Sequence, residues 1–170
     1  MSARGALRRA SRAMSADDAA NFLGLATVMR LGTVDDEGWP YVVPLSFVYK
    51  DGKVYFHHTA EDSHLTSCLE TGPRVCIEVD ETGPVYLGGE LGSESACDIG
   101  RVFKSVIAFG RASLVTDLRA KEQVFDLFVE RYPLPGTDSP RTFPKLETTL
   151  IFQVEVEVIT GKKVEQLPPG

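Results

Sequence analysis

The sequence predicts a mainly β protein, an antiparallel β-barrel with flanking helices. Six or seven segments have the alternating or β-branched composition of strands, and tight turns join many of them. Only three short segments have helical spacing, which is too few to cover a parallel sheet. A chain of 170 residues is sufficient for one domain with a sizeable core and short for two. We therefore expect a single domain over residues 15–170.

One helix and one strand are expected at the start of this domain. Ser15 can cap a helix whose first turn is acidic, as the helix dipole favours. Gly24 is expected to end that helix. Residues 28–34 have strand composition, and the acidic turn over residues 35–38 leads into the next strand.

A hairpin around Asp51-Gly52 is the clearest element. Two strand segments, Tyr41–Tyr49 and Lys53–His58, flank this dipeptide, which is a strong hairpin signal. Proline cannot donate to a strand ladder, so Pro44 predicts an edge, a bulge or a break. A break at Val43–Leu45 would leave backbone groups free for a ligand, and simple edge protection explains Pro44 equally well.

A short helix, a strand and a long connection follow the hairpin. Residues 61–70 place Leu65 and Leu69 on one helical face. Residues 74–80 alternate, which indicates a strand with one buried face. Residues 81–100 are rich in Gly, Ser and acidic residues, and are expected to form a connection without regular structure.

The last third of the chain should contain two long strands separated by a helix. Residues 102–115 are the longest strand candidate, and Gly110 marks a bend or bulge. Asp117 can cap a helix that ends at Arg131. Residues 150–160 are the last strand candidate, and after Phe152 apolar and acidic residues alternate, so one face is wet. We expect the edge of this strand to pair with a second copy, which predicts a homodimer.

Composition and charge are typical of a globular protein outside the membrane. The net charge of −6 argues against non-specific nucleic-acid binding, and no apolar run approaches the roughly 20 residues of a membrane span. Three cysteines without a CxxC pair fit the reducing cytoplasm. Residues 1–14 are Arg-rich and acid-free like a transit peptide, but a disordered basic N-terminal tail is the favoured interpretation.

Residues suited to anion binding gather between the second hairpin strand and the next helix. They are His57, His58, Thr59, Ser63 and His64. Imidazole and hydroxyl groups beside free N–H groups at a helix N-terminus favour a phosphate. Lys104 and Ser105 on the long strand, with Arg101, could add donors. Taken singly, each of these residues is more often an ordinary rim or surface residue.

A zinc or haem site is the competing chemistry. His57, His58 and His64 are potential ligands, and Cys68 lies at i+4 from His64 on the same helical face. Adjacent histidines on a strand point to opposite faces, which argues against His57 and His58 sharing one ion. The sequence has no GxSxG motif, so it does not support a nucleophilic triad. It also has no loop ending in GK[ST], so it does not support a P-loop.

The order of these segments resembles the pyridoxamine 5′-phosphate oxidase-like flavoproteins, nearest the branch that includes the nitroimidazole-resistance reductases. The most specific segments are DxxGxPYVVPLSF, VYFH and PRVCIEVD followed by SVIAFGRA, and the resemblance covers residues 15–162. It implies a split-barrel homodimer that binds FMN in a cleft between the subunits. It also implies a flavin-dependent oxidoreductase that reduces a small aromatic or nitro compound.

The resemblance assigns cofactor-binding positions as well. The backbone of one strand would face the flavin ring, at Val43, Pro44, Leu45 and Ser46. His58 and Thr59, with His57 as the alternative by one residue, would match the pair that ends the next strand. Ser63 and His64 would match the phosphate-binding stretch. Lys104 and Ser105 would approach the site, with the partner subunit as one source.

At the phosphate-binding stretch the chain departs from the family pattern. The family usually has lysine or arginine there, whereas this chain has His64 and Leu65. Two fixed cations would hold a phosphate dianion more firmly. The resemblance therefore leaves three alternatives open: haem or another flavin-like cofactor in place of FMN, a non-catalytic flavin- or haem-storage protein, and a dimeric scaffold without a ligand.

Overall fold

The part of the chain that the structure describes contains seven strands and three α-helices. The computed structural model describes residues 4–58, 63–71, 73–87, 95, 97–133 and 142–165. The strands are β1 (Val28–Val34), β2 (Pro40–Ser46), β3 (Val48–Lys50), β4 (Lys53–His58), β5 (Arg74–Tyr86), β6 (Gly100–Leu114) and β7 (Leu150–Val164). The helices are α1 (Ala16–Leu25), α2 (His64–Thr71) and α3 (Leu118–Arg131), and a short 3-10 helix, η1 (Ala10–Arg12), precedes them.

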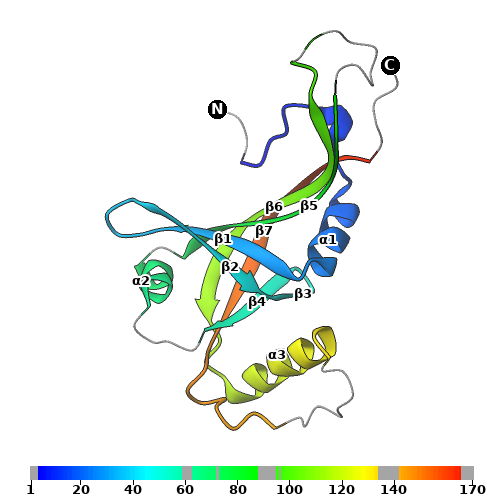
Figure 1. Cartoon of the computed structure of the whole chain (residues 1–170). Coiled ribbons are helices and arrows are strands. Elements are labelled where there is room, and N and C mark those ends of the chain that lie inside the picture. Colours follow the sequence, from blue (N-terminus) through cyan, green and yellow to red (C-terminus); the bar gives the residue numbers. More distant parts are fainter. Residues whose placement is uncertain are drawn as a thin grey trace.

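All seven strands belong to one antiparallel sheet in the order β2-β1-β5-β6-β7-β4-β3. The two ends of this order, β2 and β3, are consecutive in the chain, so the chain curls the sheet into a barrel between them. In Figure 1, α1 and α2 lie on opposite sides of the barrel and α3 covers its lower end. The predicted β-barrel with flanking helices is confirmed.

Alternate residues of the strands fill the barrel interior. The largest of these buried side chains are Met29, Leu31, Val54, Phe56, Ile77, Val79, Val106 and Val154. Burying one such side chain contributes about 1.5–3 kcal/mol relative to exposure. A second, smaller cluster between α3 and the barrel contains Val48, Val124, Phe128 and Ile151. The alternation that predicts the strands therefore also builds the core.

The predicted helix caps are present. Ser15 Oγ accepts the Asp18 N–H at 3.0 Å, and Asp117 Oδ1 accepts the Ala120 N–H at 2.8 Å. Helix α1 continues past Gly24, where the ring of Tyr49 approaches, and α2 begins at His64, later than predicted. No helix among the described residues is both long and apolar enough to cross a membrane.

The strand predicted over residues 41–49 is wrong in one respect, because the structure breaks it at Phe47. Phe47 is 1% exposed and bends the chain from β2 to β3. Its N–H donates to the Tyr132 hydroxyl at 3.3 Å. That hydroxyl lies 2.8 Å from the Phe47 carbonyl oxygen and 2.9 Å from the Thr27 carbonyl oxygen. A side chain from the end of α3 therefore satisfies the backbone of the bend.

The break considered at Val43–Leu45 is absent, because these residues pair without interruption with Leu31–Met29. Pro44 lies on the edge strand β2, so of the edge, the bulge and the break that proline predicts here, the edge is confirmed. The hairpin at Asp51-Gly52 is confirmed. Both residues have positive φ angles, 50° and 78°, as a type I′ turn requires.

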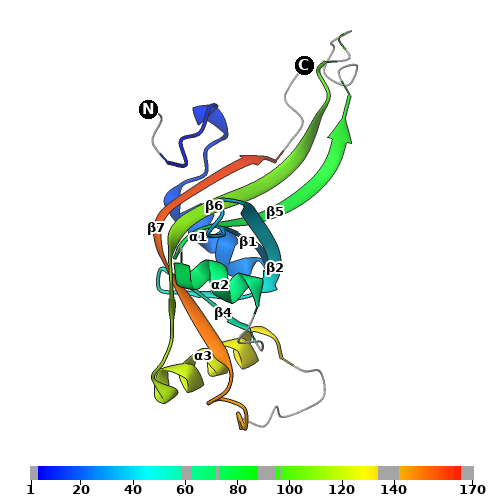
Figure 2. The same cartoon turned by 90° about the vertical axis from the view of Figure 1, so that its left-hand side faces the viewer.

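Two strands run further than predicted. Strand β5 continues to Tyr86, since Glu81 and Thr82 still pair with Lys104 and Phe103. Only part of the predicted connection over residues 81–100 is therefore irregular, and residues 88–94 and 96 lie outside the described chain. Strand β7 continues to Val164. The extended ends of β5, β6 and β7 project together beyond the barrel (Figures 1 and 2).

The predicted bulge at Gly110 is confirmed. From Phe109 to Gly110 the pairing partner on β7 moves from Val158 to Val156, so Glu157 is an extra residue. A Cβ atom on Gly110 would collide with the carbonyl oxygen of Glu155, so this close approach requires glycine. Strand β7 itself lies between β6 and β4. Strand β4 pairs with β7 only over Leu150–Glu155, so the pairing of two copies through the rest of this edge stays a prediction.

Residues 4–14, for which the sequence predicts a disordered tail, make defined contacts along β7. The Met14 N–H donates to the Gly161 carbonyl oxygen at 2.8 Å, and Ala13 forms a bridge with Lys162. Arg4 pairs with Glu157 at 3.0 Å. A Cβ atom on Gly161 would lie 2.8 Å from the Met14 sulfur, so glycine permits this packing. We call residues 4–14 the N-terminal segment.

Replacing Tyr132 with Phe should destabilise the protein by about 1–3 kcal/mol, because the buried backbone groups of Phe47 lose their partner. Denaturant unfolding monitored by circular dichroism measures this change. Tyr55→Phe is the matched control, since no described group bonds the Tyr55 hydroxyl. Equal stability of the two variants would show that the Tyr132 hydroxyl does not hold the bend.

Candidate functional site

The N-terminus of α2 is the first component of the site. Ser63 Oγ accepts the Thr66 N–H at 3.1 Å and lies 3.0 Å from the Thr66 hydroxyl, so Ser63 caps the helix. The N–H groups of His64 and Leu65 are in the first turn and cannot be used within the helix. These two donors and the helix dipole favour an anion at this end of α2.

The side chains of α2 point to two different surroundings. Leu65 and Leu69 are buried in the barrel core, at 2% and 5% exposure. The side chain of Leu65 therefore cannot face a phosphate, whatever residue relatives have there. The His64 ring packs edge-on against Tyr41 of β2, with ring centroids 4.7 Å apart, and its side chain is half-exposed. This contact places the start of α2 beside β2.

The outer edge of β2 is the second component. Strand β2 pairs only with β1, so alternate N–H and C=O groups along Val43–Ser46 face away from the sheet. Val43 and Leu45 are half-buried on the inner face, and Pro44 and Ser46 are exposed on the outer face. Such an edge can bond the polar rim of a flat ligand.

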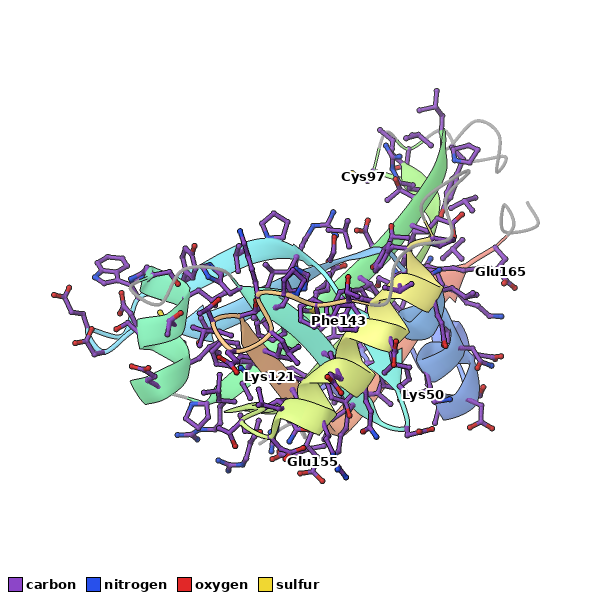
Figure 3. All side chains as sticks on the ribbon, turned by 90° about the horizontal axis from the view of Figure 1, so that it is seen from below. Lys50, Cys97, Lys121, Phe143, Glu155 and Glu165 are labelled. Atoms are coloured by element: carbon purple, nitrogen blue, oxygen red, sulfur yellow. The ribbon has the colours of Figure 1, made fainter. Side chains whose placement is uncertain are left out.

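The end of β4 divides its histidines between two faces, as predicted. His57 points toward α3, where its ring centroid lies 5.0 Å from that of Phe128 and 5.6 Å from that of Phe125. Figure 3 shows α3 and Phe143 on this underside of the barrel, and Phe143 stacks on Phe125 at 5.1 Å. His58 pairs with Leu150 in the sheet. Thr59 lies outside the described residues.

His57 is an uncharged ring in an apolar position. Its Nδ1 atom is buried and has no hydrogen-bond partner in the described part of the chain. Burial lowers the pKa of His57 from its usual value, and the charge of His58 lowers it further. The imidazole is therefore held neutral against the α3 rings, away from the start of α2.

Lys104 and Ser105 lie on β6, far along the strand from the end of α2. The end of α2 is near Pro73, whose carbonyl oxygen accepts the Ala112 N–H at 2.7 Å. Ser105 is seven residues from Ala112 along β6, or about 23 Å of extended strand. Lys104 instead pairs with Glu165 at 3.4 Å. Lys104 also lines a pocket with Val28 and Arg30 of β1, whose pairing partners on the edge strand β2 are Ser46 and Pro44.

The geometry does not support metal or thiol chemistry at α2. The described residues contain no group of three or more potential metal ligands. His64 Nε2 lies 3.7 Å from Cys68 Sγ and 3.9 Å from Asp35 Oδ2, so both contacts fall on one nitrogen. Burial raises the pKa of the Cys68 thiol, and the charges of Asp35 and Asp36 raise it further. Cys68 is therefore a buried thiol rather than an activated nucleophile.

Asp35 and Tyr41 are neighbours of the site that sequence reasoning missed. Asp35 lies in the β1–β2 turn, and its Oδ1 accepts the Trp39 N–H at 2.7 Å. Tyr41 begins the inward-facing row of β2. The acidic turn was visible in the sequence, but its proximity to α2 depends on how the helix packs on the barrel.

Comparison with known proteins agrees with this fold. A family model described as pyridoxamine 5′-phosphate oxidase matches residues 15–163. A search of curated proteins found no relative of this chain.

Several solved structures share the fold. The flavocytochrome Anf3 from Azotobacter vinelandii is 23% identical, with a TM-score of 0.79 over 99% of this chain and 76% of that one. A FAD-binding protein from Mesorhizobium loti is 25% identical, with a TM-score of 0.63 over 91% of this chain and 98% of that one. A candidate 5-nitroimidazole antibiotic resistance protein from Bacteroides thetaiotaomicron is 20% identical, with a TM-score of 0.71 over 88% of this chain and 85% of that one.

His57 should make the protein less stable as the pH falls. Its pKa in the folded state is below the ordinary value of 6.5, so the unfolded chain binds the proton more readily. Stability from the neutral ring is complete above about pH 6.5 and is lost as the pH decreases toward the folded pKa. His57→Phe keeps an aromatic ring against Phe125 and Phe128 and removes the titration.

Unfolding free energies at pH 7.5 and 5.5 measure this effect. The decrease between the two pH values should be smaller in His57→Phe than in the unmodified protein, since all other titrating groups are shared. An equal decrease in both proteins would contradict the neutral, buried state of His57.

Proposed function

The chain belongs to the pyridoxamine 5′-phosphate oxidase family, and from this we propose that it binds FMN and reduces a small aromatic or nitro compound. Solved structures of the same fold include a FAD-binding protein, a flavocytochrome and a candidate nitroimidazole resistance protein. These relatives support a flavin as the cofactor class. The choice of FMN and the substrate class rest on the motif resemblance of residues 15–162.

The observation that carries the proposal is the contact between the start of α2 and β2. The His64 ring touches Tyr41, so two unused helix N–H groups lie beside an unpaired strand edge. The helix N–H groups offer an anion site to a phosphate, and the strand edge offers hydrogen-bond partners to a flavin ring. Ser63 strengthens this end by capping the helix. The donor set present therefore fits a phosphate-bearing flat cofactor.

A bound flavin would supply the hydride chemistry, and the protein would supply position and surroundings. The N–H groups of His64 and Leu65 would hold the phosphate. The backbone of Val43–Ser46 would orient the ring at the β2 edge, and Thr59, which follows β4 in the chain, is proposed to border the same cleft. His57 and His58 would close the end of β4 against water, His57 through its contacts with the α3 rings.

The proposed cleft is completed by a second copy of the chain. The outer face of β1 and β2 is apolar and exposed at Val34, Pro40, Val42 and Pro44, with Val42 61% exposed. Exposed apolar area of this kind is typical of an interaction surface. Because this face borders the β2 edge, a copy placed on it could bring its own Lys104 and Ser105 to the flavin. We infer a homodimer on these grounds, and the free cysteines Cys68, Cys76 and Cys97 favour the reducing cytoplasm.

A storage protein that holds flavin or haem without turnover is the second candidate. It is favoured by the burial of Leu65, which leaves His64 as the titratable side chain at the start of α2. Reduction of the bound cofactor by a nicotinamide donor, followed by reoxidation with a nitroaromatic compound, separates the two candidates. A cofactor that stays inert under these conditions favours storage.

FMN should remain bound at about one per subunit after gel filtration of the mixed protein. His64→Ala removes the imidazole, and His64→Pro also removes the N–H while keeping the helix, because proline is tolerated at this first position. We expect FMN affinity to fall about tenfold further in His64→Pro than in His64→Ala. Flavin fluorescence titration measures both. Equal affinities would exclude the N–H contact, and a colourless unmodified protein would refute FMN binding.

Val42→Glu should dissociate the dimer, because a carboxylate in an apolar interface loses its hydration without gaining a partner. Sedimentation velocity measures the change in mass, and FMN retention should fall with it. Leu118→Glu on α3 is the matched control, since Leu118 is exposed on a different element. A dimer that survives Val42→Glu would place the interface elsewhere.

A further inference from the structure

A cavity lies between the N-terminal segment and the outer face of β6 and β7. Its volume is about 310 Å³. Its floor is one outward row of β6, formed by Phe103, Ser105, Ile107 and Phe109, whereas Val106 and Ala108 between them point into the barrel core. The N-terminal segment covers this floor from Gly5 to Arg12. Figure 2 shows the segment beside the projecting ends of β6 and β7.

The lining of this cavity is cationic. Arg8, Arg9, Arg12 and Lys162 contribute to it, and none of the described Asp and Glu residues does. In the described part of the chain, none of the three guanidinium groups forms an ion pair. Arg4 contrasts with them, because Glu157 at 3.0 Å neutralises it. An acidic chain of net charge −6 thus concentrates uncompensated positive charge at one cavity. We call it the basic cavity.

Size and wall chemistry narrow the ligand class. At about 30 Å³ per water molecule, the basic cavity has room for roughly ten waters, far more than one inorganic phosphate displaces. Its volume is at the lower end of the range for organic-ligand pockets, about 300–1,000 Å³. Phe103 provides aromatic surface for a flat ring, whereas the Phe109 ring lies beneath the Arg4 guanidinium, and arginine forks match phosphate oxygens in pairs. A nucleotide has both parts.

We propose that the basic cavity binds a nucleotide through its phosphates and its base. The phosphates bind Arg8, Arg9 and Arg12, and the base lies against the Phe103 ring of β6. Lys162, which lies 5.4 Å from the Phe103 ring centroid, is placed between the two parts. Binding also fastens the N-terminal segment to β6 and β7, because the arginines and the floor come from separate elements.

This site is separate from the start of α2, and its test does not require that a flavin binds. Two sources offer the same chemistry: the adenylate half of a dinucleotide cofactor such as FAD, and a free nucleotide. Ser105 lines the basic cavity and is also one of the residues proposed to reach the flavin from the partner copy. In that dimer the basic cavity adjoins the flavin cleft, so the adenylate half of one FAD molecule could reach the cavity while its flavin ring lies in the cleft.

Calorimetric titration with ADP tests the proposal, on protein without flavin and on protein loaded with FMN. We expect one ADP per chain in both, with affinity decreasing as salt increases. Arg9→Gln/Arg12→Gln should weaken ADP at least tenfold, and Arg9→Lys/Arg12→Lys should weaken it less, because charge is kept and the fork is lost. Lys50→Gln/Arg119→Gln removes two exposed charges elsewhere and should leave affinity unchanged.

Competition between ADP and flavin nucleotides shows which of the two sources supplies the nucleotide. If FAD displaces ADP and the Gln double variant weakens FAD but not FMN, the ligand is the adenylate half of the cofactor. If ADP binds equally to FAD-loaded protein, the ligand is a free nucleotide. The proposal is overturned if 1 mM ADP does not bind or if FMN displaces ADP. It is also overturned if the control variant Lys50→Gln/Arg119→Gln loses as much ADP affinity as Arg9→Gln/Arg12→Gln. Thermal melting without ligand checks that every variant is folded.

Discussion

The bend at Phe47 is the constraint on which the barrel depends. Strands β2 and β3 are one almost continuous run of strand-forming residues, yet they occupy opposite ends of the sheet order. Both backbone groups of Phe47 are used by one hydroxyl, that of Tyr132, which also lies 2.9 Å from the Thr27 carbonyl oxygen. The chain therefore leaves the edge of β2 without a neighbouring strand, and that open edge is what makes the β2 site possible.

Local chemistry made much of this fold predictable. Ser15, Asp117, Asp51-Gly52 and Gly110 each act on residues close in sequence or demand a particular backbone, and the structure confirms all four. The bend was not predictable, because its partner lies 85 residues away. At the site, the spacing of Leu65 and Leu69 already indicated burial, whereas the position of Asp35 beside His64 depends on packing across the barrel.

The distribution of charge matters more here than its sum. The net charge argues against non-specific nucleic-acid binding, and that conclusion concerns the whole surface. At short range, however, the field is set by which charges are paired. Glu157 forms ion pairs with Arg4 and Arg111, both at 3.0 Å. Within the described chain, Arg8, Arg9 and Arg12 form no ion pair and keep their positive charge. The N-terminal segment is thus anchored by the ion pair of Arg4 and carries unpaired positive charge at the three arginines that follow.

The extra residue Glu157 divides β7 into two stretches with opposite parity. Before the bulge the inward residues have even numbers, such as Val154 and Val156, and after it they have odd numbers, such as Ile159 and Gly161. Because Val156 pairs with Gly110 and Val158 with Phe109, deleting Glu157 alone would restore regular alternation and keep every later side chain on its present face. The bulge is therefore the place where β7 holds one residue more than its pairing needs, and Gly161 would keep its position against Met14 and Ala19 without that residue.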